Sequence, residues 1–135
     1  QAAESALTLA ESWINAQIGK PVFPNMGSGL YLPDAGLSGD PDGVDNWNEN
    51  IWAGGNVVTY PNTPAGAGSG TLGKINNQPR YIVEDMGEKQ ESGGSLVLTS
   101  SYKSKGTTVV RITARGTGGT DAAQVMLQST YSRAF

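Results

Sequence analysis

The 135-residue chain contains no cysteine and no histidine. The absence of cysteine excludes disulfides, thiol nucleophiles and thiolate metal sites. The absence of histidine removes the side chain that most often serves as a general base and as a metal ligand. We therefore expect no catalytic centre and no cofactor, and we predict that the protein is not an enzyme.

Positive charge and long apolar runs are also scarce. The chain has 9 Lys and Arg residues against 12 Asp and Glu residues, which gives a net charge of −3. This balance argues against nucleic acid and anionic lipid as partners, because both require a basic surface. No apolar run within these residues is long enough to span a bilayer. With 37% hydrophobic residues and 19 glycines, we expect a modest core and much loop.

Residues 1–18 have the periodicity of an amphipathic helix. Small or aromatic side chains recur at steps of three and four residues, at Ala3, Ala6, Ala10 and Trp13. Gly19 and Pro21 form a stop signal, because glycine suits the position after a helix and proline cannot continue it. No Ser, Thr, Asp or Asn precedes Gln1 as an N-cap. We therefore expect these residues to be the second part of a longer helix.

The rest of the chain separates into a loop-rich region, residues 19–78, and a strand-rich region, residues 79–135. Alternating apolar and polar residues predict strands at 108–116 and 123–133. Further strands are predicted at 80–86 and 95–102, with a short one at 56–60. The glycines of GTGGTD suit a hairpin between the last two long strands. We predict an α+β fold in one domain, with the N-terminal helix packed on a small antiparallel sheet.

Three stretches resemble a known family. QAAESALTLAESWI resembles the helix of a type IV pilin just after its membrane-spanning part. PRYIVEDMG and the block RITARG…GGTDAAQVMLQSTY resemble the C-terminal half of PilX-like minor pilins. Many pilins close a C-terminal loop with a disulfide, and this chain, which has no cysteine, departs from that pattern.

The resemblance implies a pilin-like fold and a structural role. PilX-like minor pilins combine with other minor pilins in the inner membrane, prime growth of a filament of major pilin, and lie at or near the pilus tip with the tip adhesin. A methylated transmembrane helix would precede Gln1, with the headgroup in the periplasm before assembly and in the extracellular pilus afterwards. Cell adhesion and twitching motility are the expected processes. A minor pseudopilin of type II secretion is the nearest alternative.

The helix also supplies the candidate subunit interface, formed by Ala2, Ala3, Ala6, Ala10 and Trp13. The N-terminal alanines are expected to project past the sheet towards neighbouring helices. The alternative is that the same stripe faces the domain's own sheet, as any amphipathic helix does.

An acidic loop, SGDPDGVDNWNEN, offers a candidate Ca²⁺ site at Asp40, Asp42, Asp45 and Glu49. Clustered oxygen ligands near a glycine suit this ion. The EF-hand spacing is not met, and Asp and Asn also form turns without any metal.

Aromatic residues offer a candidate carbohydrate platform at Tyr31, Trp47, Trp52 and Tyr60. The alternative is that the tryptophans hold the long loop on the sheet. A stand-alone module that binds Ca²⁺ or carbohydrate is therefore a third possible function.

The adjacent acids Glu84 and Asp85 lie on a predicted strand, so their side chains point to opposite faces and cannot act as an acid–base pair. We instead expect Glu84 to pair across the sheet with Arg111 or Arg115.

Overall fold

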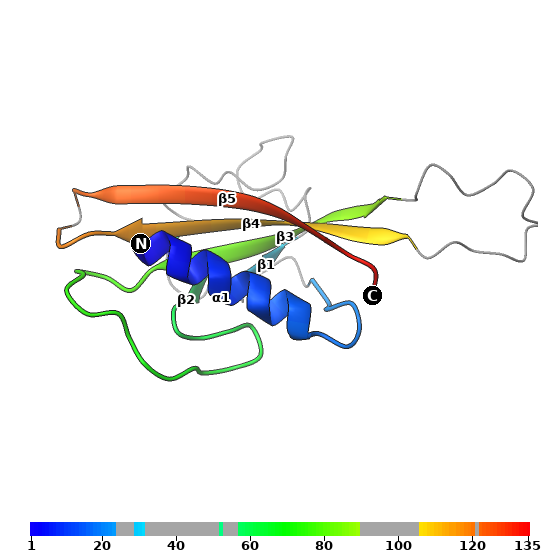
Figure 1. Ribbon diagram of the computed structural model, residues 1–135, viewed down its shortest axis with the longest axis horizontal. Coiled ribbons are helices and arrows are strands. Elements are labelled where there is room, and N and C mark those ends of the chain that lie inside the picture. Colours follow the sequence, from blue (N-terminus) through cyan, green and yellow to red (C-terminus); the bar gives the residue numbers. More distant parts are fainter. Residues whose placement is uncertain (24–28, 32–51, 53–56, 90–105, 121) are drawn as a thin grey trace, which may run out of the picture.

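The computed structural model describes residues 1–23, 29–31, 52, 57–89, 106–120 and 122–135. One helix crosses one face of a five-stranded sheet (Figure 1). The elements are α1 (Ala2–Ala16), β1 (Leu30–Tyr31), β2 (Val58–Thr59), β3 (Arg80–Lys89), β4 (Thr107–Thr117) and β5 (Gln124–Arg133). The α+β class and the pilin-like arrangement of helix and sheet are confirmed.

The helix α1 ends at Ala16, two residues before the predicted boundary. Gln17 has an extended backbone, its amide donates to the carbonyl of Ile14 (3.2 Å) and its side chain donates to the carbonyl of Trp13 (3.0 Å). These bonds satisfy carbonyls of the last turn that a helix otherwise leaves without partners. The helix therefore does not end at Gly19, and Ile18, which we assigned to the helix, is fully exposed.

The strand order is β1-β3-β4-β5, and β2 also pairs with β3. The predicted strands at 80–86, 108–116 and 123–133 correspond to β3, β4 and β5, while the predicted strand at 95–102 lies outside the described residues. The predicted short strand at 56–60 is present as β2. The sheet is mixed and not antiparallel throughout, because β1 runs parallel to β3. The loop-rich middle region therefore contributes two short strands to the same sheet.

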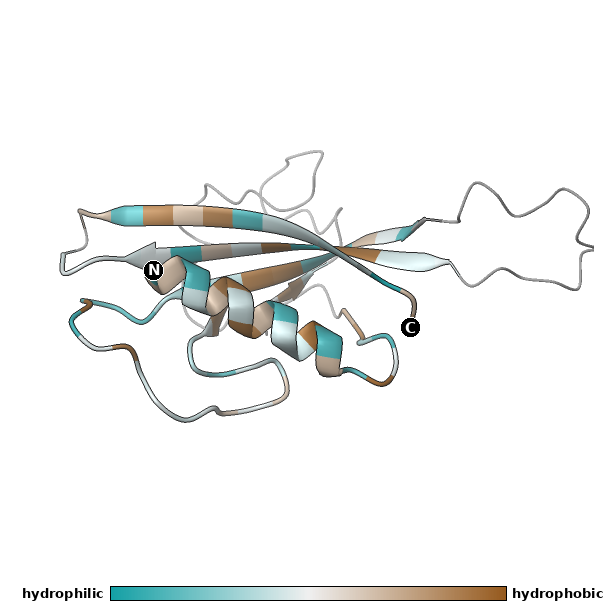
Figure 2. Ribbon diagram, viewed as in Figure 1, coloured by the Kyte–Doolittle hydropathy of each residue, from teal (hydrophilic) through white to brown (hydrophobic). Residues whose placement is uncertain are grey.

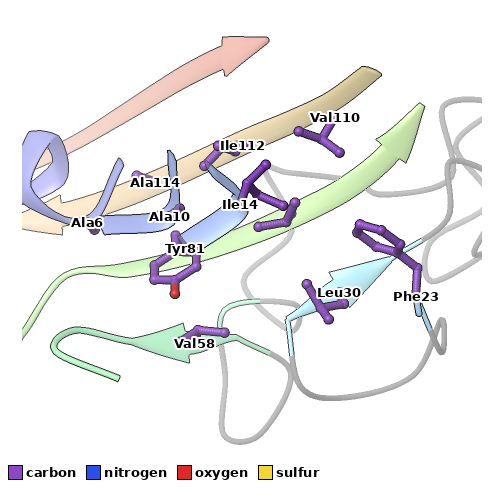
Figure 3. Packing of buried hydrophobic residues seen from close by; sticks show 11 residues of the cluster. Ala6, Ala10, Ile14, Phe23, Leu30, Val58, Tyr81, Val110, Ile112 and Ala114 are labelled. Carbon is purple, nitrogen blue, oxygen red and sulfur yellow. The ribbon is translucent and has the colours of Figure 1, made fainter. Parts of the chain in front are cut away.

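The main core lies between α1 and the sheet (Figure 3). Its buried members are Ala6, Ala10, Ile14, Phe23, Leu30, Val58, Tyr81, Val83, Val110, Ile112 and Ala114. Along α1, Ala6, Ala10 and Ile14 are completely buried and face β3 and β4. Small alanine side chains let the helix backbone approach the strands closely, so a compact core forms from few large residues.

A second cluster covers the other face of the sheet. Tyr31, Trp52, Val57 and Ile82 are buried there, and Met126 packs against them. Burial on β4 is correspondingly almost continuous and does not alternate as the sequence pattern suggested. Trp52 and its neighbours cover this face, so both faces of β4 are shielded from water.

α1 approaches the sheet closely at Gly116 in β4. A Cβ atom built on Gly116 would lie 2.6 Å from the amide nitrogen of Ala3 and 3.1 Å from the Cβ of Ala2. Main chain lies against main chain here, so any side chain at this position pushes the helix away.

We expect Gly116→Ala to lower the free energy of unfolding by about 1–3 kcal/mol, the usual cost of overpacking. Urea unfolding followed by circular dichroism measures the loss. Gly119→Ala in the neighbouring turn is the matched control, because no atom lies within 4 Å of the added Cβ. Equal losses in the two variants would show that Gly116 matters only for its backbone freedom.

Candidate assembly interface

Three of the five predicted interface residues belong to the domain's own core. Ala3 is 2% exposed, and Ala6 and Ala10 are 0% exposed. They are covered by the sheet of the same chain, so they are not available to another subunit. The expectation that the N-terminal alanines project past the sheet is corrected for the same reason, because Ala3 lies against Gly116.

The other two predicted interface residues, Ala2 and Trp13, are half-buried at the flank of α1. Trp13 packs against the main core, yet its indole Nε1 is buried with no hydrogen-bond acceptor among the described residues. A role for Ala2 and Trp13 in subunit contacts stays a prediction.

A groove of about 750 Å³ runs between α1 and the segment that leads from β2 to β3. The helix side is lined by Gln1, Ala2, Glu4, Ser5, Thr8, Leu9 and Ser12, and the loop side by Tyr60, Leu72, Gly73 and Ile75. The groove is wide open and its walls mix apolar and polar side chains. Sequence reasoning did not find it, because the loop side has no periodic pattern that would place it beside the helix.

A buried ion pair fixes the centre of the sheet. Both carboxylate oxygens of Glu84 accept hydrogen bonds from Arg111, at 3.1 Å from Nε and 2.7 Å from Nη2. Glu84 is completely buried. The predicted cross-strand pair is confirmed, with Arg111 as the partner. The neighbouring Asp85 points to the opposite face, as predicted, and forms an ion pair with Lys20 (3.0 Å).

Two arginines hold Trp52 on the sheet. Arg80 Nη1 donates to the Trp52 carbonyl (2.6 Å), and the Arg115 guanidinium lies 5.8 Å from the centre of the indole ring. Because Trp52 and Tyr31 are both buried, neither can present a face to a sugar. Trp52 itself packs on the sheet, as the alternative expected, whereas Trp47 lies outside the described residues.

Burial also raises the pKa of the Tyr81 and Tyr31 phenols, because the charged form would be removed from water. Tyr81 therefore stays protonated at neutral pH, where its hydroxyl donates to the Asn62 carbonyl (3.2 Å). This bond ties β3 to the loop after β2.

All four residues of the candidate Ca²⁺ site, Asp40, Asp42, Asp45 and Glu49, lie outside the described residues. Within the part of the chain that the structure describes, no three acidic side chains gather as a metal site would require. The same part of the chain has no helix with the length and hydropathy needed to cross a membrane.

Comparison with known proteins identifies the family. The family model described as "Type IV pilus assembly protein PilX C-term" matches residues 16–133, which is most of the chain. Searches of curated proteins and of solved structures gave no match. The matched region contains all five strands and every residue of the buried ion pair described above. The chain therefore belongs to the PilX family of type IV pilus assembly proteins.

Proposed function

We propose that this protein is a minor pilin that combines with other minor pilins to prime assembly of the type IV pilus, and that it lies at or near the pilus tip. The observation that carries the proposal is the match to the PilX assembly family over residues 16–133. The architecture supports it, because a helix packed on a sheet gives a headgroup that can be carried on a helical stalk.

The charged side chains of the described residues also favour a structural role. Glu84 and Arg111 bind each other, Arg80 binds a main-chain carbonyl, and Lys20 binds Asp85. Each of these groups holds parts of the headgroup together. These internal bonds stabilise the headgroup, and a stable headgroup can present fixed surfaces to neighbouring subunits.

We further propose that the native protein is anchored in the inner membrane by an apolar helix ahead of Gln1, with the headgroup in the periplasm before assembly and in the pilus afterwards. Contacts with the major pilin and the tip adhesin would follow from a place at the tip. The family assignment supports this proposal, because pilus subunits are drawn from the membrane into the filament.

Deletion of the gene from its host tests the priming role. We expect the number of surface pili, counted by electron microscopy, to fall sharply in the deletion strain, because few filaments are started without the priming step. The full-length gene should restore the pili. In the wild-type host, mass spectrometry of the native protein should find about 20 apolar residues before Gln1, the length that spans a bilayer. Unchanged pili together with lost protein secretion would instead favour the type II secretion pseudopilin.

A further inference from the structure

β5 forms an outer edge of the sheet. It pairs with β4 along one side, and within the described ranges no segment lies against its other side (Figure 1). An edge strand carries a row of backbone N–H and C=O groups that can pair with a strand of another chain. Which residues of β5 present these groups follows from the hydrogen bonds of the neighbouring strands.

One hydrogen bond of β3 shows which of its residues direct their N–H and C=O groups towards β4 and which direct them away from it. The Val83 amide donates to the Gly29 carbonyl (2.8 Å), so Val83 directs its backbone groups away from β4. Direction alternates along a strand, so Glu84 directs its groups towards β4. Glu84 is opposite Arg111 in the register, and these two residues therefore exchange main-chain bonds.

The same alternation continues into β5. Because Arg111 bonds to β3, its neighbour Ile112 bonds to β5, where it is opposite Ser129. The turn agrees, since the Gly118 amide donates to the Ala123 carbonyl (2.8 Å), which continues the same series of pairs. The residues that direct their N–H and C=O groups outward therefore include Met126, Gln128, Thr130 and Ser132.

The two edges of the sheet differ in protection. On the opposite edge, β1 and β2 cover part of β3, and the rest is distorted by a β-bulge that contains Gly87 at φ 95°. Bulges and short edge strands are the usual devices against edge pairing. β5 has none of them: its register with β4 is unbroken, and it contains no proline, lysine or acidic residue. Its one charge, Arg133, donates to the Ile14 carbonyl (2.6 Å).

We propose that the outer edge of β5 accepts an extended strand from a different pilin subunit. The partner strand must be uncharged. It would place apolar or small side chains beside Val125 and Leu127 on the α1 face, and polar side chains beside Gln128 and Thr130 on the other face. In Figure 2 the half of β5 nearest the β4–β5 turn carries a brown, hydrophobic stretch between two teal bands, and Val125 is 55% exposed.

A second copy of this chain does not fit the outer edge of β5. This conclusion rests on the proposed function, in which all subunits are anchored in one membrane. Antiparallel pairing of β5 with β5 would reverse α1, and parallel pairing would place the two helices on opposite faces of the joined sheet. Subunits with anchors in one membrane need their helices in one direction and on one face. Both conditions are met only if β5 pairs with the other edge of the partner's sheet, the edge that corresponds to β3 in this chain. In this chain that edge is covered by β1 and β2, so the partner must be a different subunit.

The test uses the full-length protein in its native host, with a photo-crosslinking amino acid at Ser132, which is exposed. Irradiation should produce an adduct with a different subunit whose tryptic peptides identify it as a pilin. Thr130→Pro should reduce the adduct by roughly tenfold, because it removes an outward N–H. Thr130→Val keeps that N–H and should leave the adduct unchanged.

The purified Thr130→Pro headgroup should melt within a few degrees of the wild type, because proline at an outward N–H removes no bond to β4. If it does not fold, Thr130→Lys provides the same test through a charge on the edge. An adduct with a second copy, no adduct, or an adduct that neither variant changes would overturn the proposal. Normal piliation in the deletion strain, together with the Ser132 adduct in the strain that carries the gene, would overturn only the priming role.

Discussion

Ala10→Glu is expected to unfold the headgroup. Ala10 is 0% exposed and lies between α1 and the strands, so the new carboxylate has neither water nor a partner. Burial of an unpaired charge or its forced exposure costs several kcal/mol, on the order of the total stability of about 5–15 kcal/mol. Urea unfolding, monitored by circular dichroism, measures the loss.

Ala16→Glu is the matched control, because it makes the same substitution on the same helix at an exposed position. Its cost should stay below about 1 kcal/mol, mainly from a negative charge at the C-terminal end of the helix. A folded Ala10→Glu headgroup that fails only in pilus assembly would return Ala10 to the subunit interface. Measurement of piliation and headgroup stability together therefore separates the two roles of the alanine stripe.

Glu84→Gln is the second substitution with a large expected effect. It keeps the size of the side chain but turns one acceptor of the Arg111 bonds into a donor, so Arg111 loses a charged partner at a buried site. Loss of one member of a buried ion pair costs about 3–5 kcal/mol. Thermal and urea unfolding of the purified headgroup measure this cost.

The double variant Glu84→Met with Arg111→Met shows whether the stability lost in Glu84→Gln comes from the Arg111 charge that remains without its carboxylate. Two apolar residues of similar volume can replace a buried pair at little cost, so the double variant should be more stable than either single variant. Lys20→Gln is the comparison for the Lys20–Asp85 pair, in which the Lys20 side chain is 37% exposed and the Asp85 side chain is 8% exposed. It should cost less than Glu84→Gln, because the Asp85 carboxylate keeps the bond that it accepts from the Gly87 amide (3.0 Å). If the losses of stability in the two single variants add up in the double variant, Glu84 and Arg111 do not stabilise the fold as a pair.

The sequence predicted the elements whose patterns repeat over many residues. The residues of β4 and β5 alternate between apolar and polar, and the opposite charges on β3 and β4 indicated Arg111 or Arg115 as the partner of Glu84. The register of the two strands selects Arg111. β1 was missed because two residues, Leu30 and Tyr31, carry no period. Its partner strand lies far along the chain, so no local signal could place it.

The candidate interface was harder to predict, for a physical reason. Alanines at Ala3, Ala6 and Ala10 permit a close approach of any backbone, so the pattern does not say whether the neighbour is the domain's own sheet or another helix. Burial by β4 decides the question. The position of β5 at an edge of the sheet could not be predicted either, because the sequence of one strand does not show which strands pair with it.

The contacts between α1 and β5 have a consequence for the order of folding. Glu11 accepts a bond from Ser129 (2.8 Å), Asn15 accepts one from Tyr131 (3.0 Å), and Arg133 reaches the last turn of the helix across 119 positions of sequence. The helix thus keeps contacts with a strand that is made 119 positions later. At about 5–20 residues per second, the inner face of α1 stays bare for roughly ten seconds during synthesis. Such non-local contacts slow folding. We expect the emerging helix to need protection until β3 and β4, which cover its inner face, have been made.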